Sequence, residues 1–142
     1  MADSTAHVTW KGSLLEGAGT IDDVGSGAFA GLPVSWQART GEKEGETTPE
    51  ELLAAAHAAC FSMALANVLA QGGTPPTKLD TSATVTFVPG TGITTIALSV
   101  RATVPGLEEP AFLHAAGEAK ANCPVSKAFV VAPEITLDAA LA

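Results

Sequence analysis

Two cysteines are the residues of this chain whose type and setting could do chemistry. Cys123 precedes Pro124, which suits the first position of a helix, so Cys123 would be the N-cap of that helix. A thiol there faces backbone N–H groups and the positive end of the helix dipole, and both lower its pKa. Cys60 lies inside an apolar stretch, where a cysteine can also pack as a small hydrophobic residue. Together the two thiols would be enough for a cycle of peroxide reduction or disulfide exchange.

A metal site is the competing use of these cysteines. His57 and Cys60 are three residues apart, which places them on one face of a helix, and Cys123 could be a third ligand. No CxxC or HExxH motif accompanies them. The other two histidines, His7 and His114, have no ligand-like neighbours and are expected to be ordinary surface or packed histidines.

The chain has two arginines, and their positions differ. Arg101 falls on the outward face of a predicted strand, the usual place for a solvated charge. Arg39 follows a predicted strand and precedes a charged loop, residues 40–47, that leads into the helix of Cys60. Because a guanidinium stays charged, Arg39 could be the partner of both a thiolate and a carboxylate.

A long apolar helix over residues 48–73 must position Cys60. Thr48 is the expected N-cap, with Pro49 at the first helical position and Glu51 completing a capping box in which hydroxyl and carboxylate each satisfy a backbone N–H. Gly72-Gly73 and Pro75-Pro76 end the helix. Three residues interrupt its apolar surface between positions 52 and 70, so we expect it to be buried on every side: His57, Ser62 and Asn67.

A membrane span is the alternative for this helix, because about 20 apolar residues cross a bilayer. However, no Lys or Arg flanks it, and Glu50 and Glu51 stand at its start. The remaining chain alternates like β-structure in soluble proteins. We therefore interpret the stretch as a core helix.

The other elements indicate an α+β fold with antiparallel sheets, in one domain covering residues 1–142. A Gly-rich loop is expected over residues 22–30, and Pro33 pushes the strand that follows it towards a sheet edge. An amphipathic second helix is predicted over residues 109–121. Strands are predicted over residues 7–11, 13–21, 32–38, 81–88, 95–104 and 135–137.

Composition restricts the partners. The net charge of −8 argues against nucleic acid or an anionic membrane. The N-terminus shows no secretory signal, which favours the cytoplasm, where thiols stay reduced. Apolar residues make up 46% of the chain and charged residues only 15%, which suggests that a second subunit covers part of the surface.

Four segments make the chain similar to a known family: WKGSLLEGAGTI, LPVSWQARTGE, TPEELLAAAHAACFSMALA and AKANCPVSKA. They resemble the osmotically inducible protein C (OsmC) branch of the OsmC/organic hydroperoxide resistance superfamily. The resemblance implies antiparallel sheets packed around a long buried central helix in an intertwined homodimer. It also implies a thiol-dependent peroxidase of organic hydroperoxides without metal, haem or flavin, regenerated by a lipoyl-type or other dithiol.

The resemblance implies a role for four residues. Cys60 would be the peroxidatic thiolate and Cys123 the resolving thiol, while Arg39 would hold thiolate and peroxide and Glu50 would orient Arg39. Helix-dipole reasoning instead makes Cys123 the thiol of lower pKa. We follow the resemblance, because an interior thiol beside Arg39 could be activated more strongly than a bare N-cap. A redox-responsive or small-ligand-binding protein, using the same disulfide as a switch without turnover, is the alternative function.

Helix geometry predicts that the site is built from two chains. Glu50 and Cys60 are ten residues apart, which on one continuous helix is about 15 Å of rise, with the side chains roughly 80° apart around the axis. Arg39 does not readily pair with both across that gap. Either the helix breaks between them, or Arg39 and Glu50 reach the Cys60 of a partner subunit, and we expect the second arrangement.

Overall fold

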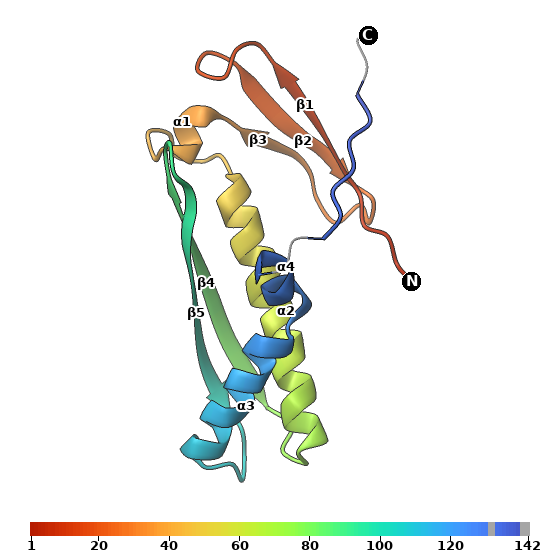
Figure 1. The fold of residues 1–142 in the computed structure, drawn as a ribbon, viewed down its shortest axis with the longest axis vertical. Coiled ribbons are helices and arrows are strands. Elements are labelled where there is room, and N and C mark those ends of the chain that lie inside the picture. The colour runs from red at the N-terminus through yellow and green to blue at the C-terminus, as the bar shows by residue number, and fades with distance from the viewer. Residues whose placement is uncertain (131–132, 140–142) are drawn as a thin grey trace. The chain divides into compact units, whose positions relative to one another are not determined.

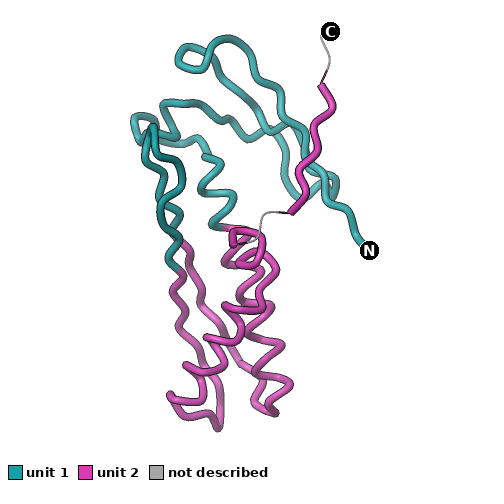
Figure 2. Tube along the Cα trace, viewed as in Figure 1, with its two compact units in different colours: residues 1–54, 84–97 teal, residues 55–83, 98–142 magenta. Residues whose placement is uncertain are grey.

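The computed structural model describes residues 1–130 and 133–139. The chain divides into two compact units, which are described separately (Figure 2). The first unit comprises Met1–Ala54 and Thr84–Ala97, and the second comprises Ala55–Ala83 and Leu98–Ala142. Helix α2 (Pro49–Gln71) and the hairpin of β4 (Lys78–Val88) and β5 (Gly92–Thr103) have residues in both units.

The first unit contains an antiparallel sheet of β1 (Ala6–Lys11), β2 (Ala18–Val24) and β3 (Ala30–Val34), in the order β1-β2-β3 (Figure 1). Strand β2 starts at Ala18, not at residue 13 as predicted, because Ser13 begins a turn in which its carbonyl accepts the Gly17 N–H at 2.9 Å. A Cβ on Gly17 would overlap that carbonyl. At its other end β2 runs to Val24, so the predicted loop from residue 22 is shorter.

Strand β3 lies at the sheet edge, as Pro33 predicts, but it ends four residues earlier than expected. The chain turns instead into α1 (Trp36–Arg39), a single helical turn. Ser35 is its N-cap: the hydroxyl accepts the Ala38 N–H at 3.2 Å and donates to the Glu46 carboxylate at 2.5 Å. A serine that bonds its own backbone in this way ends a strand, which the alternation of apolar residues did not reveal.

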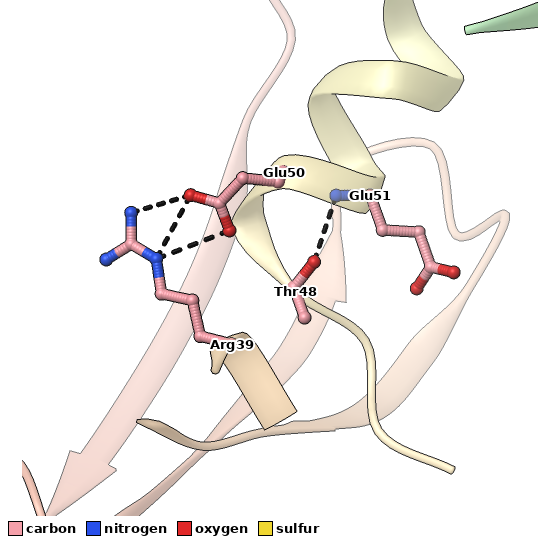
Figure 3. A network of polar contacts seen from close by, with 4 residues as sticks. All are labelled: Arg39, Thr48, Glu50 and Glu51. Carbon is pink, nitrogen blue, oxygen red and sulfur yellow. Dashed lines mark hydrogen bonds and ion pairs between the residues drawn. The ribbon is translucent and has the colours of Figure 1, made fainter. Parts of the chain in front are cut away.

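Helix α2 begins and ends where local signals predict. The Glu51 N–H donates to the Thr48 hydroxyl at 3.0 Å (Figure 3), whereas the Glu51 carboxylate accepts from the Thr47 hydroxyl at 2.7 Å instead of closing the predicted capping box. At the other end Gly73 has a φ of 82°. The N–H groups of Gly73 and Thr74 donate to the carbonyls of Ala70 and Leu69, both at 3.0 Å, which is a Schellman motif.

The core of the second unit lies between α2 and α3 (Glu109–Asn122). One face of α2 contributes Phe61, Leu65 and Leu69, and α3 contributes Ala115 and Ala119, as its predicted amphipathic pattern requires. These two alanines are buried in the same cluster as the three larger side chains of α2. Partly buried residues of β4 and β5 complete this core: Leu79, Leu98 and Val100.

The opposite face of α2 is exposed in the single chain. The prediction that α2 is buried on every side is therefore wrong for the single chain. Ala55, Ala56 and Ala59 are exposed, and Met63 is 74% exposed. By length and composition α2 could cross a membrane, but a single such helix is weak evidence, because core helices pass the same test.

The β4–β5 hairpin follows its predicted alternation, with every second residue from Leu79 to Phe87 half-buried. Its turn is closed by the Thr91 N–H, which donates to the Val88 carbonyl at 3.0 Å. The last predicted strand is wrong: residues 133–139 contain no strand, and Ile135 and Leu137 are 84% and 88% exposed. A segment of three residues does not make a strand without a neighbour that supplies hydrogen bonds.

Candidate active site

Arg39 and Glu50 form a nearly bidentate ion pair within the first unit (Figure 3). The Arg39 Nη2 lies 2.7 Å from Glu50 Oε1, and Nε lies 3.0 and 3.3 Å from Oε1 and Oε2. Arg39 is the last residue of α1, and Glu50 lies in the first turn of α2, where the helix dipole favours a carboxylate. The pairing expected from the resemblance is therefore present.

Aromatic packing holds the arginine in place. The Arg39 guanidinium carbon lies 4.1 Å from the centroid of the Phe87 ring, a cation–π contact. Trp36 packs edge-on against the same ring, with centroids 6.1 Å apart. The Glu50 side chain is only 7% exposed and that of Arg39 is 32% exposed. A charged group is thus kept in one geometry, with part of its surface open.

Cys60 and Cys123 are both free thiols of the second unit. Cys60 lies in the middle of α2 and is half-buried, whereas Cys123 is fully buried. Cys123 joins α3 to α4 (Pro124–Val130): its N–H donates to Ala119 at 2.8 Å, and its carbonyl accepts the Lys127 N–H at 3.0 Å. The predicted N-cap position of Cys123 is confirmed.

The two thiols have opposite pKa shifts. Burial raises the pKa of Cys60; the Val125 N–H opposes this, and the hydrogen bond and charge of Cys123 add to it. Burial also acts to raise the pKa of Cys123. It is outweighed by hydrogen bonds from the Ser126 N–H, the Cys60 thiol, the Ser126 hydroxyl and the Val125 N–H, so the pKa of Cys123 is lowered. In the single chain the pKa of Cys123 is therefore lower than that of Cys60, as helix-dipole reasoning predicts.

His57 lies one helical turn before Cys60 and is 5% exposed. Its Nε2 is 2.7 Å from the Ser126 hydroxyl oxygen, and its ring packs on Phe129 with centroids 5.5 Å apart. Burial lowers the pKa of His57. The sequence suggested His57 only as a metal ligand and did not single out Ser126. The matching spacings, His57 to Cys60 and Cys123 to Ser126, were the available signal.

The remaining sequence-predicted residues lie elsewhere. Arg101 is exposed and donates to the carbonyl of Val100. His7 pairs with Asp23 at 2.8 Å, and the exposed His114 lies 3.7 Å from Glu118. Across residues 1–130 and 133–139, no three His, Cys, Asp or Glu side chains gather as metal ligands. Helix α2 is continuous from Pro49 to Gln71, so the broken-helix alternative is wrong.

Comparison with known proteins identifies close relatives. A family model described as OsmC-like protein matches residues 41–138. Peroxiredoxin OsmC of Escherichia coli (strain K12) is 44% identical over 132 residues, which cover 91% of this chain and 90% of that protein.

Solved structures share the fold at lower identity. An organic hydroperoxide resistance protein OsmC from Legionella pneumophila has a TM-score of 0.63 at 24% identity, covering 88% of each chain. An OsmC-like protein of unknown function from Vibrio cholerae has a TM-score of 0.69 at 18% identity, covering 90% of this chain and 94% of that one. The mixed architecture of helices and antiparallel sheets is therefore the one these proteins have.

Proposed function

Because this chain belongs to the family of OsmC-like proteins, we propose that Cys60 and Cys123 reduce organic hydroperoxides to alcohols. The protein is a cysteine-based peroxidase, like the relative named peroxiredoxin to which it is 44% identical over 132 residues. The observation that carries this conclusion is the thiol pair itself. Two free cysteines from distant parts of the chain lie in one apolar cluster beside the N-terminus of α4: Cys60 packs against the buried core that contains Cys123.

The proposed cycle has two chemical steps before regeneration. The Cys60 thiolate attacks the terminal oxygen of the hydroperoxide, the O–O bond breaks, and the alkoxide takes a proton and leaves as the alcohol. Cys60 is then a sulfenic acid. The Cys123 thiolate attacks the Cys60 sulfur, the S–O bond breaks, and hydroxide takes a proton and leaves as water. A dithiol then reduces the disulfide by exchange.

The first step needs a cation beside Cys60, because Cys123 is the preferred thiolate in the single chain. Arg39 is the residue we assign to this role, with Glu50 as the group that orients it. On the continuous α2, Glu50 precedes Cys60 by about 15 Å of rise. We therefore assign Arg39 and Glu50 to the Cys60 site of a partner subunit in a homodimer.

The exposed face of α2 supports this dimer. Alanines and Met63 form an apolar strip along the turns that carry Cys60, and a second copy of the chain would remove that strip from water. In such a dimer the Arg39 guanidinium of one subunit would approach the Cys60 thiol of the other subunit. It would reverse the pKa order of the two sulfurs by favouring the charged form of Cys60.

The surroundings of Cys60 favour a substrate with an alkyl group. Phe61 and Ala64 are apolar neighbours on α2, and Phe61 is buried in the core. Burying a methylene contributes roughly 0.8 kcal/mol, or about fourfold in kcat/KM. Lengthening the alkyl group of the hydroperoxide should raise kcat/KM accordingly. Equal or better kcat/KM for hydrogen peroxide would contradict this substrate preference.

Turnover with a dithiol tests the enzyme directly. The purified protein is mixed with an excess of an alkyl hydroperoxide and a lipoyl-type dithiol, and peroxide consumption is followed. Many equivalents consumed per chain are expected. Loss of a single equivalent that then stops would indicate a disulfide switch without turnover and would reject the peroxidase cycle.

Mixed dimers test the shared site. Chains carrying Cys60→Ser and chains carrying Arg39→Ala should each be inactive, and after subunit exchange each mixed dimer should hold one intact site. The expected result is recovery of activity in proportion to the heterodimers formed. Heterodimers that form but stay inactive would contradict the arrangement across subunits.

A further inference from the structure

Glu46 is a carboxylate that turns inward from a loop whose other charges face solvent. Residues 40–47 carry four charged side chains, and three of them are exposed: Glu42, Lys43 and Glu44. The Glu46 side chain, in contrast, is only 12% exposed. Withdrawing a carboxylate from water costs free energy unless hydrogen bonds and an opposite charge replace the solvent. A loop that served only to connect two elements would not place a carboxylate there.

Two partners replace the solvent around Glu46. The Ser35 hydroxyl donates to Oε2 at 2.5 Å, and the Lys43 ammonium pairs with Oε1. The Lys43 side chain is 52% exposed, and exposed ion pairs contribute little to stability. Ser35 is buried, so its hydrogen bond to a charged acceptor is the stronger of the two contacts. Glu46 therefore acts mainly on Ser35.

The Ser35 hydroxyl passes this effect to α1. A hydroxyl has one proton and two lone pairs; Ser35 gives the proton to Glu46 and accepts the Ala38 N–H at 3.2 Å. Glu46 thus fixes the rotation of the hydroxyl so that a lone pair faces the helix. Because α1 has only four residues, it depends on this cap. The last of the four is Arg39.

The backbone on the other side of Glu46 is also fixed. The Thr47 N–H donates to the Pro33 carbonyl at 3.2 Å, and the Thr47 hydroxyl donates to the Glu51 carboxylate at 2.7 Å. The residue after Glu46 is therefore tied both to β3 and to the first turn of α2. From that fixed point the Glu46 side chain reaches Ser35.

The contacts of the Arg39 side chain depend on where α1 places its backbone. Nε and Nη2 donate to the Glu50 carboxylate along one edge of the guanidinium (Figure 3), and the Phe87 ring covers its face at 4.1 Å. Both contacts are directional, since one is a pair of nearly parallel N–H donors and the other requires stacking. If α1 lost its cap, the Arg39 side chain would leave this geometry.

We infer that Glu46 is a positioning residue for Arg39, which it holds on Glu50 through the Ser35 cap of α1. The inference rests on the proposed function for its effect on Cys60, because in that proposal the Arg39 charge favours the thiolate. The position of the guanidinium itself can be measured without peroxide. Glu46 touches neither substrate nor thiol in this role, so it is not a catalytic residue.

Exchange of the arginine Nε–H protons with water tests the position of Arg39. The chain has two arginines, so NMR resolves a signal from Arg39, bonded to Glu50, and one from the exposed Arg101 as an internal reference. Glu46→Ala should raise the Arg39 exchange rate about tenfold and leave that of Arg101 unchanged. Glu46→Gln, whose amide oxygen can still accept from Ser35, should raise it only about twofold. An unchanged Arg39 rate in Glu46→Ala would overturn the inference.

A double-mutant cycle tests the route through the cap. Ser35→Ala should raise the Arg39 exchange rate about as much as Glu46→Ala does, and in a Ser35→Ala chain Glu46→Ala should have no further effect. Effects that add would mean that Glu46 does not act through Ser35, and would overturn the inference. Glu44→Ala, an exposed carboxylate of the same loop, is the matched control and should change nothing. If Glu46→Ala does not fold, Ser35→Ala and Glu46→Gln decide the outcome.

The thiol provides a readout that a general loss of structure would not produce. With Cys123→Ser, Cys60 is the sole cysteine, and its alkylation by iodoacetamide is followed against pH. Glu46→Ala should raise the Cys60 midpoint by about half a pH unit, or about threefold less thiolate below it, and Arg39→Ala should raise it more. In a chain that carries Arg39→Ala, Glu46→Ala should leave the midpoint where it is. An equal shift in both backgrounds would overturn the inference.

Failure of the proposed function gives a different result from failure of this inference. If Arg39→Ala does not move the Cys60 midpoint, the role proposed for Arg39 fails. The exchange rate of the Arg39 Nε–H still decides whether Glu46 positions the guanidinium. If Arg39→Ala moves the midpoint but Glu46→Ala changes neither the midpoint nor the exchange rate, the proposed function stands and the positioning role of Glu46 is rejected.

Discussion

The first turn of α2 and its middle turns both carry polar residues, but the two groups differ in how many polar atoms have partners. In the first turn, Glu50 receives three hydrogen bonds from Arg39, and the Glu51 N–H donates to the Thr48 hydroxyl. In the middle turns, the Nδ1 of His57 has no hydrogen-bond partner among the described residues, and burial raises the pKa of Cys60.

This difference separates the part of the helix whose polar groups are paired from the part that carries the proposed reactive thiol. A group whose hydrogen bonds are all satisfied is held in one conformation and in one protonation state. The ionisation of two neighbouring thiols is coupled, and a nearby positive charge can change which of them ionises more readily. Perturbed pKa values cluster at functional sites, and the shifted pKa values of Cys60 and Cys123 support the proposed role of this pair.

The largest effect is expected from the reactive part. Cys60→Ser should abolish peroxide consumption, because no other residue of the thiol pair is assigned to the first attack. As the matched variant, Cys123→Ser should still form a sulfenic acid on Cys60 after one equivalent of peroxide. Mass spectrometry of the treated protein distinguishes the two sulfurs. A sulfenic acid found on Cys123 alone would reverse the roles.

Removing the ion pair of Arg39 and Glu50 in the first turn of α2 should lower the free energy of unfolding. Arg39→Ala leaves the Glu50 carboxylate buried without its partner, and we expect a loss of about 3 kcal/mol in the free energy of unfolding. The chain supplies its own control, because its other arginine is exposed: Arg101→Ala should change stability by less than about 0.5 kcal/mol. Urea denaturation measures both. Equal losses of stability in the two variants would show that the ion pair of Arg39 and Glu50 does not stabilise the fold.

Two glycines test whether the end of α2 is equally well determined. Gly73→Ala places a Cβ at a φ of 82°, so it should destabilise by about 1 kcal/mol although no atom obstructs it. Gly117→Ala, inside α3 and also unobstructed, should stabilise by about 0.5–1 kcal/mol. Thermal unfolding of the pair gives the comparison directly. A Gly73→Ala chain as stable as the parent would contradict the Schellman end.

The smallest expected effect is on the pH dependence of stability, where two histidines have pKa shifts of opposite sign. Hydrogen bonding to Asp23 and the charge of that carboxylate raise the pKa of His7 above 6.5, whereas burial lowers the pKa of His57 below 6.5. His7 therefore contributes stability below pH 6.5 that is lost as the pH rises through its folded pKa. His57 has the opposite sign: stability is lost as the pH falls below 6.5.

NMR titration of the two rings checks these directions. Asp23→Asn should bring the His7 midpoint back towards 6.5 and leave the His57 midpoint in place. Midpoints that coincide for the two histidines would remove the contrast between a partnered, exposed ring and a buried one.

Features determined by a few neighbouring residues could be predicted from the sequence. The Thr48 cap, the Gly73 end, the alternation along β4 and β5, and the N-cap position of Cys123 all depend on residues within one or two turns. The same holds for the direction of the Cys123 pKa, since its donors are the next N–H groups of α4. Short-range hydrogen bonds of this kind do not require a tertiary contact.

Only the tertiary structure decided features that depend on distant segments. Nothing local indicates which face of an all-apolar α2 is buried; the alanines of α3 select the face with Phe61 and Leu65. The strand predicted to reach residue 38 stops at Val34. The Ser35 hydroxyl caps the next helical turn by accepting the Ala38 N–H, and it is held there by a hydrogen bond to the more distant Glu46 carboxylate. The hydrogen bond between His57 and Ser126 joins residues 69 positions apart in the sequence. Only the folding of the chain brings the His57 ring to the helix that Cys123 caps.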